Sequence, residues 1–265
     1  MTIYLRRRAE VQCGFPANAG VGLAGGANIT IEASVLGEID PNTGMVVNIR
    51  EIDSAIKNAV VAPLHGRYVE HIPGARDLYP TLENLSKFAF AAIQRLLGAE
   101  HHLAFVELLT NKVRLRFHPE EAKPAMMLVT RTYDFSASHR LHSVALSQAE
   151  NIETFGKCNW QNGHGHNYIL DVTVTGDLDP IGQQIVDLTR LDSLVEELVL
   201  LPMDHKHLNY DVPDFVHLNP TSENLTIVIW QRLLEPIAEL LNGNGRLYRV
   251  VVCETARNYF EYYGD

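Results

Sequence analysis

The strongest constraint on the fold is an internal repeat. Asn28 to Pro41 aligns without gaps with Asn167 to Pro180, 139 residues further along the chain. In both segments apolar side chains alternate with other residues, which is the period of a strand with one buried face. A pattern that occurs twice indicates two copies of one structural unit. The chain is therefore expected to form two related units rather than one large core.

The same register extends into a predicted amphipathic helix in each copy. Apolar residues recur there every three or four positions, as a helix with one buried face requires. The aligned pairs are Ile49 and Leu188, Ile52 and Leu191, Ile56 and Val195, Val60 and Val199, and Pro63 and Pro202. One residue out of step, residues 81–85 match residues 221–225. Each of these segments predicts the start of a second helix, with a threonine N-cap and an acidic first turn.

Each copy is expected to end in two short strands. The strand-like runs cover residues 105–109 and 113–117 in the first copy, and 247–254 and 259–263 in the second. The repeated unit is therefore strand-strand-helix-helix-strand-strand. This order favours an α+β fold in which two helices cover one face of an antiparallel four-stranded sheet. A short charged segment bounded by prolines, Pro119 to Pro124, marks the seam. We name residues 1–122 the first repeat and residues 123–265 the second repeat.

Composition makes several classes of function unfavourable. The net charge of −10 disfavours a surface for nucleic acid or for anionic membranes. No apolar run reaches the roughly 18 residues that span a bilayer, and the N-terminal charges follow the apolar residues, unlike those of a signal peptide. The three cysteines cannot all pair within the chain, so a reduced, cytoplasmic compartment is expected.

A candidate metal site lies at the start of a predicted strand in the second repeat. His164 and His166 are two residues apart, so in an extended strand their imidazoles project from the same face. His139 follows an earlier strand-like run and supplies a third imidazole. Three neutral histidines suit Zn²⁺ and leave a fourth position for water or substrate, an arrangement typical of catalytic zinc. An ordinary polar pair on a strand is the alternative interpretation of His164 and His166 alone.

The first repeat lacks these histidines. His164 and His166 align with Gly25 and Ala27, whereas the apolar positions of the strand are kept. The segment around Cys158 has no equivalent in the first repeat. We therefore expect the first repeat to be a structural partner without a metal of its own.

Two further polar features of the second repeat are also missing from the first. Asp204 and His205 follow the predicted helix, where they form either a tuned proton carrier or a solvated loop. They align with His65 and Gly66. Glu254, beside Thr255 near the turn between the last two strands, aligns with Leu109 of the first repeat. The loss of these groups together with the histidines favours a functional interpretation.

Together these residues resemble the pattern of the 6-pyruvoyltetrahydropterin synthase family. The matching segments are Phe135-Ser-Ala-Ser-His139-Arg-Leu141, Phe155-Gly-Lys-Cys158, His164-Gly-His166-Asn-Tyr168, Asp204-His205-Lys206, Thr221-Ser-Glu223-Asn224 and Cys253-Glu254-Thr255. The resemblance covers residues 126–265, and the first repeat shares only the scaffold.

The resemblance implies a tandem T-fold (tunnelling fold), with a degenerate unit at 1–122 and a catalytic unit at 123–265. It also implies a site in which zinc is bound by His139, His164 and His166. By the same resemblance Cys158 is the catalytic base, Asp204 and His205 form a proton relay, and Glu254 holds the pterin ring. Thr221, Glu223 and Thr255 are then expected to contact the substrate. T-fold units close their sheets against neighbours, so a homotrimer of tandem chains is expected.

The implied reaction converts 7,8-dihydroneopterin triphosphate to 6-pyruvoyltetrahydropterin with elimination of triphosphate, catalysed by a carbon-oxygen lyase. Arg140, Lys157 and Lys206 are candidate counter-charges for the triphosphate. The alternative is 6-carboxytetrahydropterin synthase of the queuosine pathway, which usually has three residues between its cysteine and the first histidine of the pair. The five residues between Cys158 and His164 favour the pyruvoyl branch. A non-catalytic pterin-binding scaffold is a hypothesis of another class, and it suits the first repeat alone.

Overall fold

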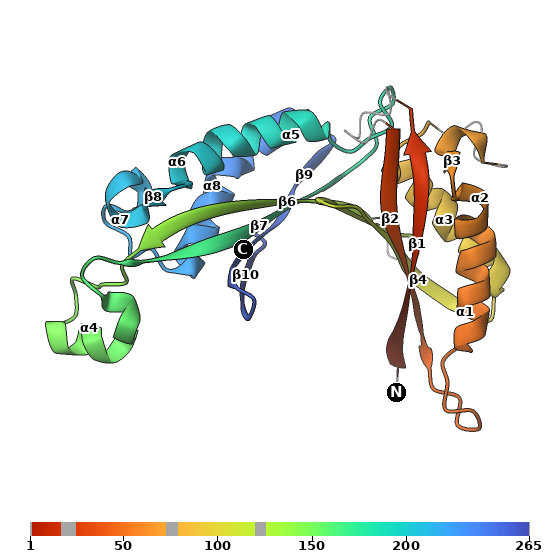
Figure 1. Ribbon diagram of the computed structural model, residues 1–265, viewed down its shortest axis with the longest axis horizontal. Helices are drawn as coiled ribbons and strands as arrows, with labels where there is room; N and C mark the ends of the chain where they lie inside the picture. The colour runs from red at the N-terminus through yellow and green to blue at the C-terminus, as the bar shows by residue number, and fades with distance from the viewer. Residues whose placement is uncertain (1, 17–24, 73–78, 120–125, 265) are drawn as a thin grey trace. The chain divides into compact units, whose positions relative to one another are not determined.

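The structure is a computed structural model that describes residues 2–16, 25–72, 79–119 and 126–264. Both copies of the predicted strand-strand-helix-helix-strand-strand order are present in it (Figure 1). Most of the predicted seam, residues 120–124, lies outside the described residues, and so does the expected boundary between 122 and 123.

The elements of the first repeat are β1 (Thr2–Phe15), β2 (Gly25–Glu38), α1 (Ile49–Ile56), α2 (Ala62–Leu64), β3 (Arg67–Tyr68), α3 (Leu82–Leu97), β4 (His102–Leu109) and β5 (Val113–His118). Those of the second repeat are β6 (Met126–His139), α4 (Gln148–Phe155), β7 (His164–Gly176), α5 (Leu188–Val195), α6 (Leu201–Met203), β8 (Lys206–His207), α7 (Leu208–Asp211), α8 (Ser222–Leu240), β9 (Gly245–Thr255) and β10 (Asn258–Tyr262).

Each repeat builds its sheet in the same order. The strands of the first repeat follow the order β5-β4-β2-β1-β3, and those of the second follow β10-β9-β7-β6, with β8 beside β6. The long pair β1 and β2 is antiparallel, as are β2 with β4, β4 with β5, and β9 with β10. The antiparallel α+β arrangement predicted from the sequence is confirmed.

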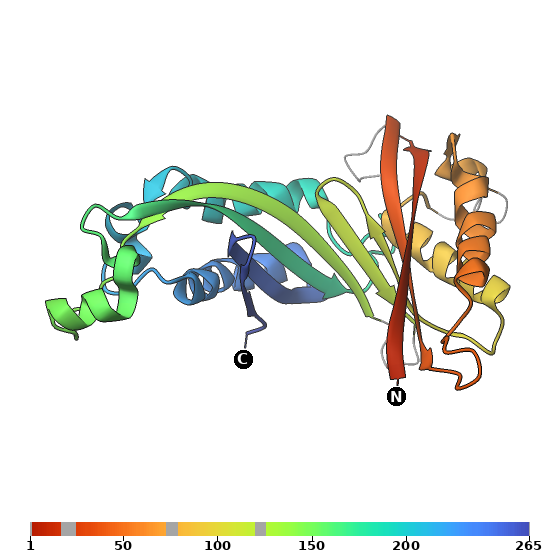
Figure 2. The same ribbon diagram turned by 60° about the horizontal axis from the view of Figure 1, so that its bottom comes forward.

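The helices pack on one face of each sheet because apolar residues alternate along the strands. The inward residues of β2 and β7 are at most 1% exposed; they are Ile29, Ile31, Ala33, Val35, Tyr168, Leu170, Val172 and Val174. Figures 1 and 2 show α1 and α3 beside the sheet of the first repeat, and α5 and α8 beside that of the second. Burial of these side chains is the main stabilising contribution to each core.

Both predicted helix starts are confirmed. The Thr81 hydroxyl accepts a hydrogen bond from the Asn84 backbone N–H at 3.2 Å, and Thr221 caps α8 in the same way through Asn224 at 3.3 Å. Such a cap satisfies one of the unpaired N–H groups in the first turn of a helix.

The first helix of each repeat changes to a wider π-helical turn, at Lys57–Val61 and at Glu196–Leu200. A proline follows at the second position of α2 and of α6. Because proline has no N–H to donate to the preceding turn, the backbone widens there instead of continuing as a regular α-helix.

The short strands fix which residues of the two repeats correspond. β3 runs parallel to β1 and pairs Arg67 with Cys13, whereas β8 runs parallel to β6 and pairs Lys206 with Ala137. Arg67 and Lys206 are aligned in the repeat, so Cys13 is the counterpart of Ala137. Two residues further on, Phe15 is the counterpart of the last residue of β6.

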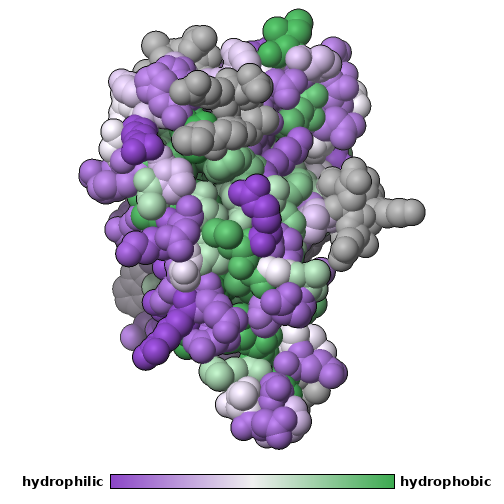
Figure 3. Space-filling model, turned by 90° about the vertical axis from the view of Figure 1, so that its right-hand side faces the viewer, coloured by the Kyte–Doolittle hydropathy of each residue, from purple (hydrophilic) through white to green (hydrophobic). Residues whose placement is uncertain are grey.

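The chain forms two compact units, Met1–Thr130 with Thr175–Leu188, and Arg131–Val174 with Thr189–Asp265. Figure 3 shows a face on which hydrophilic side chains surround a stripe of apolar ones. Ile49 of α1 and Leu96 of α3 are about half exposed. None of the described helices is long and apolar enough to cross a membrane.

Candidate active site

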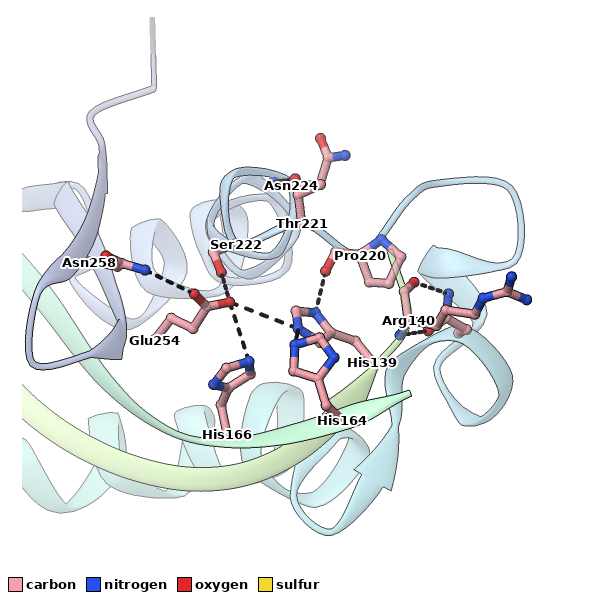
Figure 4. A network of polar contacts seen from close by, with 11 residues as sticks. His139, Arg140, His164, His166, Pro220, Thr221, Ser222, Asn224, Glu254 and Asn258 are labelled. Carbon is pink, nitrogen blue, oxygen red and sulfur yellow. Dashed lines mark hydrogen bonds and ion pairs between the residues drawn. The ribbon is translucent and has the colours of Figure 1, made fainter. Parts of the chain in front are cut away.

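His139 ends β6 and is 1% exposed, with a fixed orientation. Its Nδ1 lies 2.7 Å from the Pro220 carbonyl oxygen, just before the first turn of α8 (Figure 4). A carbonyl oxygen can only accept, so Nδ1 carries the hydrogen, and Nε2 presents its lone pair to the other side. This hydrogen bond is the kind that orients a metal-ligating histidine.

His164 and His166 begin β7, and both extend their rings toward His139 (Figure 4). The Nε2 atoms of His139 and His164 are 3.2 Å apart, and one nitrogen from each of the three rings lies within 4.8 Å of the others. The Nε2 atom of His166 is buried without a hydrogen-bond partner in the described part of the chain. Three imidazole nitrogens that converge in this way could hold a metal ion.

Gly163 makes this approach possible. Its φ of +73° belongs to the left-handed region, and a Cβ at this position would lie 2.8 Å from the His139 carbonyl oxygen. Any other residue would push the start of β7 away from the end of β6.

Burial favours the neutral imidazole at the centre of the cluster. It lowers the pKa of His139 to about 4, against the opposing effect of the hydrogen bond to Pro220. Burial and the nearby His166 also lower the pKa of His164. Neutral imidazoles are the form that binds metal ions. The donor set therefore fits a metal that prefers nitrogen ligands.

Glu254 lies near the end of β9, and its carboxylate points toward the histidines. The Ser222 hydroxyl donates to its Oε1 at 2.9 Å and the Asn258 amide to its Oε2 at 3.2 Å (Figure 4). Its Oε1 also lies 3.7 Å from Nε2 of His166. Burial opposes ionisation, but these donors and the histidines outweigh it and hold the pKa of Glu254 below its ordinary value.

Cys158 lies in the short 3-10 turn Gly156–Asn159 that follows α4, and it is partly buried, with a free thiol. Its carbonyl oxygen accepts from the Leu141 backbone N–H at 2.8 Å, which ties the turn to the end of β6. Tyr168 of β7 is fully buried, and burial raises the pKa of its phenol.

Asp204 and His205 form a pair, with Nδ1 of His205 2.8 Å from a carboxylate oxygen. The other carboxylate oxygen accepts from the Ser136 backbone N–H, and this bond, together with His205, lowers the pKa of Asp204. The His205 side chain is 82% exposed. Within the described residues, neither side chain has a hydrogen bond or ion pair with Cys158 or with the three histidines. The structure thus brings together the three histidines and Glu254 from the predicted site.

The remaining predicted contacts have ordinary local roles. Thr221 caps α8, Glu223 is exposed in the first turn, and the Thr255 hydroxyl accepts from the Arg257 backbone N–H in the final hairpin. Thr221 and Thr255 are nevertheless the immediate neighbours of the bonded pair Ser222 and Glu254.

Two residues at the site were missed by the sequence interpretation. Pro220 matters through its carbonyl oxygen, which no side-chain pattern reveals. Ser222 could have been found, because the first repeat carries Leu82 at the aligned position, just as it carries Leu109 opposite Glu254. Because the hydroxyl and the carboxylate are both replaced by leucine in the first repeat, the alignment indicates that Ser222 and Glu254 contact each other.

Comparison with known proteins agrees with the pattern in the sequence. The family model described as 6-pyruvoyl tetrahydropterin synthase matches residues 24–116 and 128–265. The chain is 44% identical over 137 residues to 6-pyruvoyl tetrahydrobiopterin synthase of Homo sapiens, covering 52% of this chain and 91% of that protein. The corresponding protein of Poecilia reticulata is 42% identical over 137 residues, covering 52% of this chain and 90% of the other. The solved structure of 6-pyruvoyl tetrahydropterin synthase from Caenorhabditis elegans is 41% identical and covers 53% of this chain and 96% of that one, with a TM-score of 0.48.

Proposed function

This chain belongs to the 6-pyruvoyl tetrahydropterin synthase family, and we propose that it converts 7,8-dihydroneopterin triphosphate to 6-pyruvoyltetrahydropterin with release of triphosphate. The observation that carries the proposal is the convergence of three imidazole nitrogens beside Glu254. Such a cluster is costly to bury without a ligand, because polar nitrogens are left without partners.

Zn²⁺ is the metal that we propose for His139, His164 and His166. When bound, it would act as a Lewis acid on the side-chain oxygens of the substrate and make the neighbouring protons more acidic. The supporting observations are the all-nitrogen donor set and the hydrogen bond that fixes the tautomer of His139.

Each nearby side chain has a proposed task. Cys158 removes a proton from the substrate, because a thiolate near positive charge is a competent base. Glu254 accepts hydrogen bonds from N–H groups of the pterin ring, a role that suits a carboxylate held ionised by Ser222 and Asn258. Thr221, Glu223 and Thr255 flank that ring.

Asp204 and His205 form the proton relay of a site in another chain. The exposure of the His205 side chain, and the absence of a hydrogen bond or ion pair from either side chain to Cys158 within the described residues, support this arrangement. The chain would then act as a homo-oligomer, for which we propose a homotrimer, with the unit at 1–122 as scaffold and the unit at 123–265 as catalyst. We place it in the cytoplasm, where its three free cysteines would stay reduced.

Incubation of the full chain with 7,8-dihydroneopterin triphosphate, followed by mass spectrometry of the products, tests the proposal. We expect 6-pyruvoyltetrahydropterin and triphosphate in equal amounts. A 6-carboxy pterin with acetaldehyde would instead assign the chain to the carboxy branch, and recovery of unchanged substrate would leave a binding protein. The five residues between Cys158 and His164 support the pyruvoyl product.

A mixing experiment tests the shared site. Chains with Cys158→Ala and chains with His205→Ala are each expected to be inactive. If the two groups come from different chains, unfolding and refolding them together should restore part of the activity. Absence of any recovery in refolded mixed oligomers would contradict the shared site.

A further inference from the structure

The segment between β6 and β7 lines a cavity. Residues 140–163 contain α4 and the 3-10 turn Gly156–Asn159, whereas only residues 16–24 separate β1 from β2 in the first repeat. This longer segment lines a cavity of about 610 Å³. The longer segment that lines the cavity thus belongs to the second repeat, like the histidine cluster.

The cavity is positively charged in an acidic chain. Arg140 and Lys157 line it together with the amides of Gln148 and Gln161, and none of its described lining residues is a carboxylate. The chain as a whole carries a net charge of −10. For comparison, a cavity beside α5 and α8 sets one arginine against two glutamates. The charge of the cavity at residues 140–161 therefore favours an anion.

The donors of this cavity are only partly used. Nε and Nη2 of Arg140 donate to Oδ1 of Asn159 at 3.2 and 3.1 Å, which fixes the guanidinium. In the described part of the chain, its Nη1 and the Lys157 ammonium have no hydrogen-bond or ion-pair partner. Asn159 is 5% exposed, and its Nδ2 is also without a partner there. A buried, unpaired amide donor is costly unless a ligand accepts from it.

From this geometry we propose that the cavity binds the triphosphate group of the substrate. Phosphate oxygens accept several hydrogen bonds at once, which suits a guanidinium, an ammonium and an amide around one space. The inference rests on the proposed function for the identity of the substrate, but the affinity of the cavity for oligophosphate does not depend on turnover.

Two of the cavity's cations are neighbours in the chain of proposed site residues. Arg140 directly follows His139, and Lys157 directly precedes Cys158. Figure 4 shows the Arg140 side chain extending away from the histidines, as required for a group that binds the far end of a substrate.

The position of the cations also suits the elimination. As a proton on the neighbouring carbon passes to the base, the C–O bond breaks and its electron pair leaves with the triphosphate oxygen. Fixed positive charges at that oxygen stabilise the charge that develops on it.

The first test is calorimetric titration of the zinc-loaded full chain with inorganic tripolyphosphate. Wild type is expected to bind it, and Lys157→Gln to bind it about tenfold or more weakly, whereas Lys157→Arg should recover most of the affinity. Lys57→Gln, an exposed lysine of the first repeat, serves as the matched control and should bind like wild type. Failure of wild type to bind, or equal binding by Lys157→Gln, would overturn the proposal.

Tripolyphosphate also chelates zinc, so the same titration is repeated on His164→Ala/His166→Ala chains. Binding that persists there belongs to the cavity, and binding that disappears belongs to the metal and counts against the proposal.

A kinetic measurement tests whether the cavity binds the substrate. Lys157→Gln should raise KM for 7,8-dihydroneopterin triphosphate about tenfold while the affinity for biopterin, which has no phosphate, stays unchanged. An unchanged KM would overturn the assignment to the substrate. If neither protein turns over the substrate but tripolyphosphate still binds through Lys157, the proposed function fails and the oligophosphate site stands.

Discussion

The two repeats differ along one connected set of positions, while their cores stay alike. Where the second repeat carries the histidines 139, 164 and 166, the first carries Phe15, Gly25 and Ala27. The strands, the capping threonines and the π turns are nevertheless the same in both. The comparison teaches that this fold does not need the polar cluster. Folding alone therefore does not explain the cluster, and the proposed metal site gives it a role.

The substitutions also follow contacts. Ser222 and Glu254 are hydrogen-bonded in the second repeat, and their counterparts in the first are Leu82 and Leu109. Changing one partner alone would leave a buried polar group unsatisfied, whereas changing both removes the cost. The first repeat thus shows which apolar side chains the fold accepts at the positions of the site. The following predictions use that comparison.

The largest effect is expected from His164→Ala/His166→Ala, which makes the second repeat resemble the first. Metal content should fall from one ion per chain to none, and turnover should become undetectable, because two of the three ligands are gone. The fold should persist, since the first repeat forms the same strand with Gly25 and Ala27. Elemental analysis and circular dichroism check both points. One full equivalent of metal in this variant would contradict the assignment.

Cys158→Ala is expected to lower kcat about 10²- to 10⁴-fold, the range for loss of a general base. Metal content should stay the same, because the thiol is not among the converging ligand atoms. Cys13→Ala is the matched control. Burial raises the pKa of Cys13 to about 11, and Ala137 occupies the corresponding place in the second repeat. Activity lost equally in both variants would show a general packing defect instead.

Ser222→Ala should weaken substrate binding by about tenfold, because Glu254 loses the hydroxyl that orients Oε1. The effect should appear in KM more than in kcat if Glu254 holds the ring and takes no part in proton transfer. Thr226→Ala, a buried hydroxyl on the same helix bonded to a backbone carbonyl, is the control for lost packing. An unchanged KM in Ser222→Ala would remove Ser222 from the site.

The sequence predicted most of the fold and part of the site. Its repeat fixed the order of elements, because apolar spacing distinguishes strand from helix in both copies. It also predicted that His164 and His166 share one face of a strand, and it named His139, at the end of an earlier strand, as the third candidate ligand. It could not place Asp204 and His205 relative to Cys158, because that distance depends on how a short edge strand pairs with β6. Nor could it show the roles of Pro220 and Asn159, which act through a carbonyl group and a buried amide.

The aligned residues Glu83 and Glu223 lie in different environments in the two repeats. Glu83 is 4% exposed and its pKa is raised to about 7, mainly by burial, whereas Glu223 is exposed. The folded state binds the proton of Glu83 more tightly than the unfolded chain does. The resulting stabilisation is fully present below about pH 4.5, and it is lost as the pH rises through 7. Glu83→Gln should therefore unfold like wild type in urea at pH 4.5 and gain on the order of 3 kcal/mol at pH 8. Glu223→Gln, at the exposed aligned position, is the matched control. Parallel stability curves for Glu83→Gln and wild type would refute the assigned pKa.

The smallest effect is expected at Tyr168, whose counterpart in the first repeat is Ile29. Both side chains are at most 1% exposed, yet the Tyr168 hydroxyl has no hydrogen-bond partner in the described part of the chain. A buried hydroxyl without a partner costs roughly 1–3 kcal/mol, part of which Tyr168→Phe should return. We expect the variant to be about 1 kcal/mol more stable in urea than wild type when both are metal-free. A bound substrate offers oxygen atoms to this hydroxyl, so the gain should shrink or reverse when a pterin occupies the site. Phe135→Leu, which alters the ring stacked on Tyr168 without touching the hydroxyl, controls for packing. A loss of stability in metal-free Tyr168→Phe would mean that the hydroxyl already has a partner, and that the second repeat, like the first, is fully satisfied without a ligand.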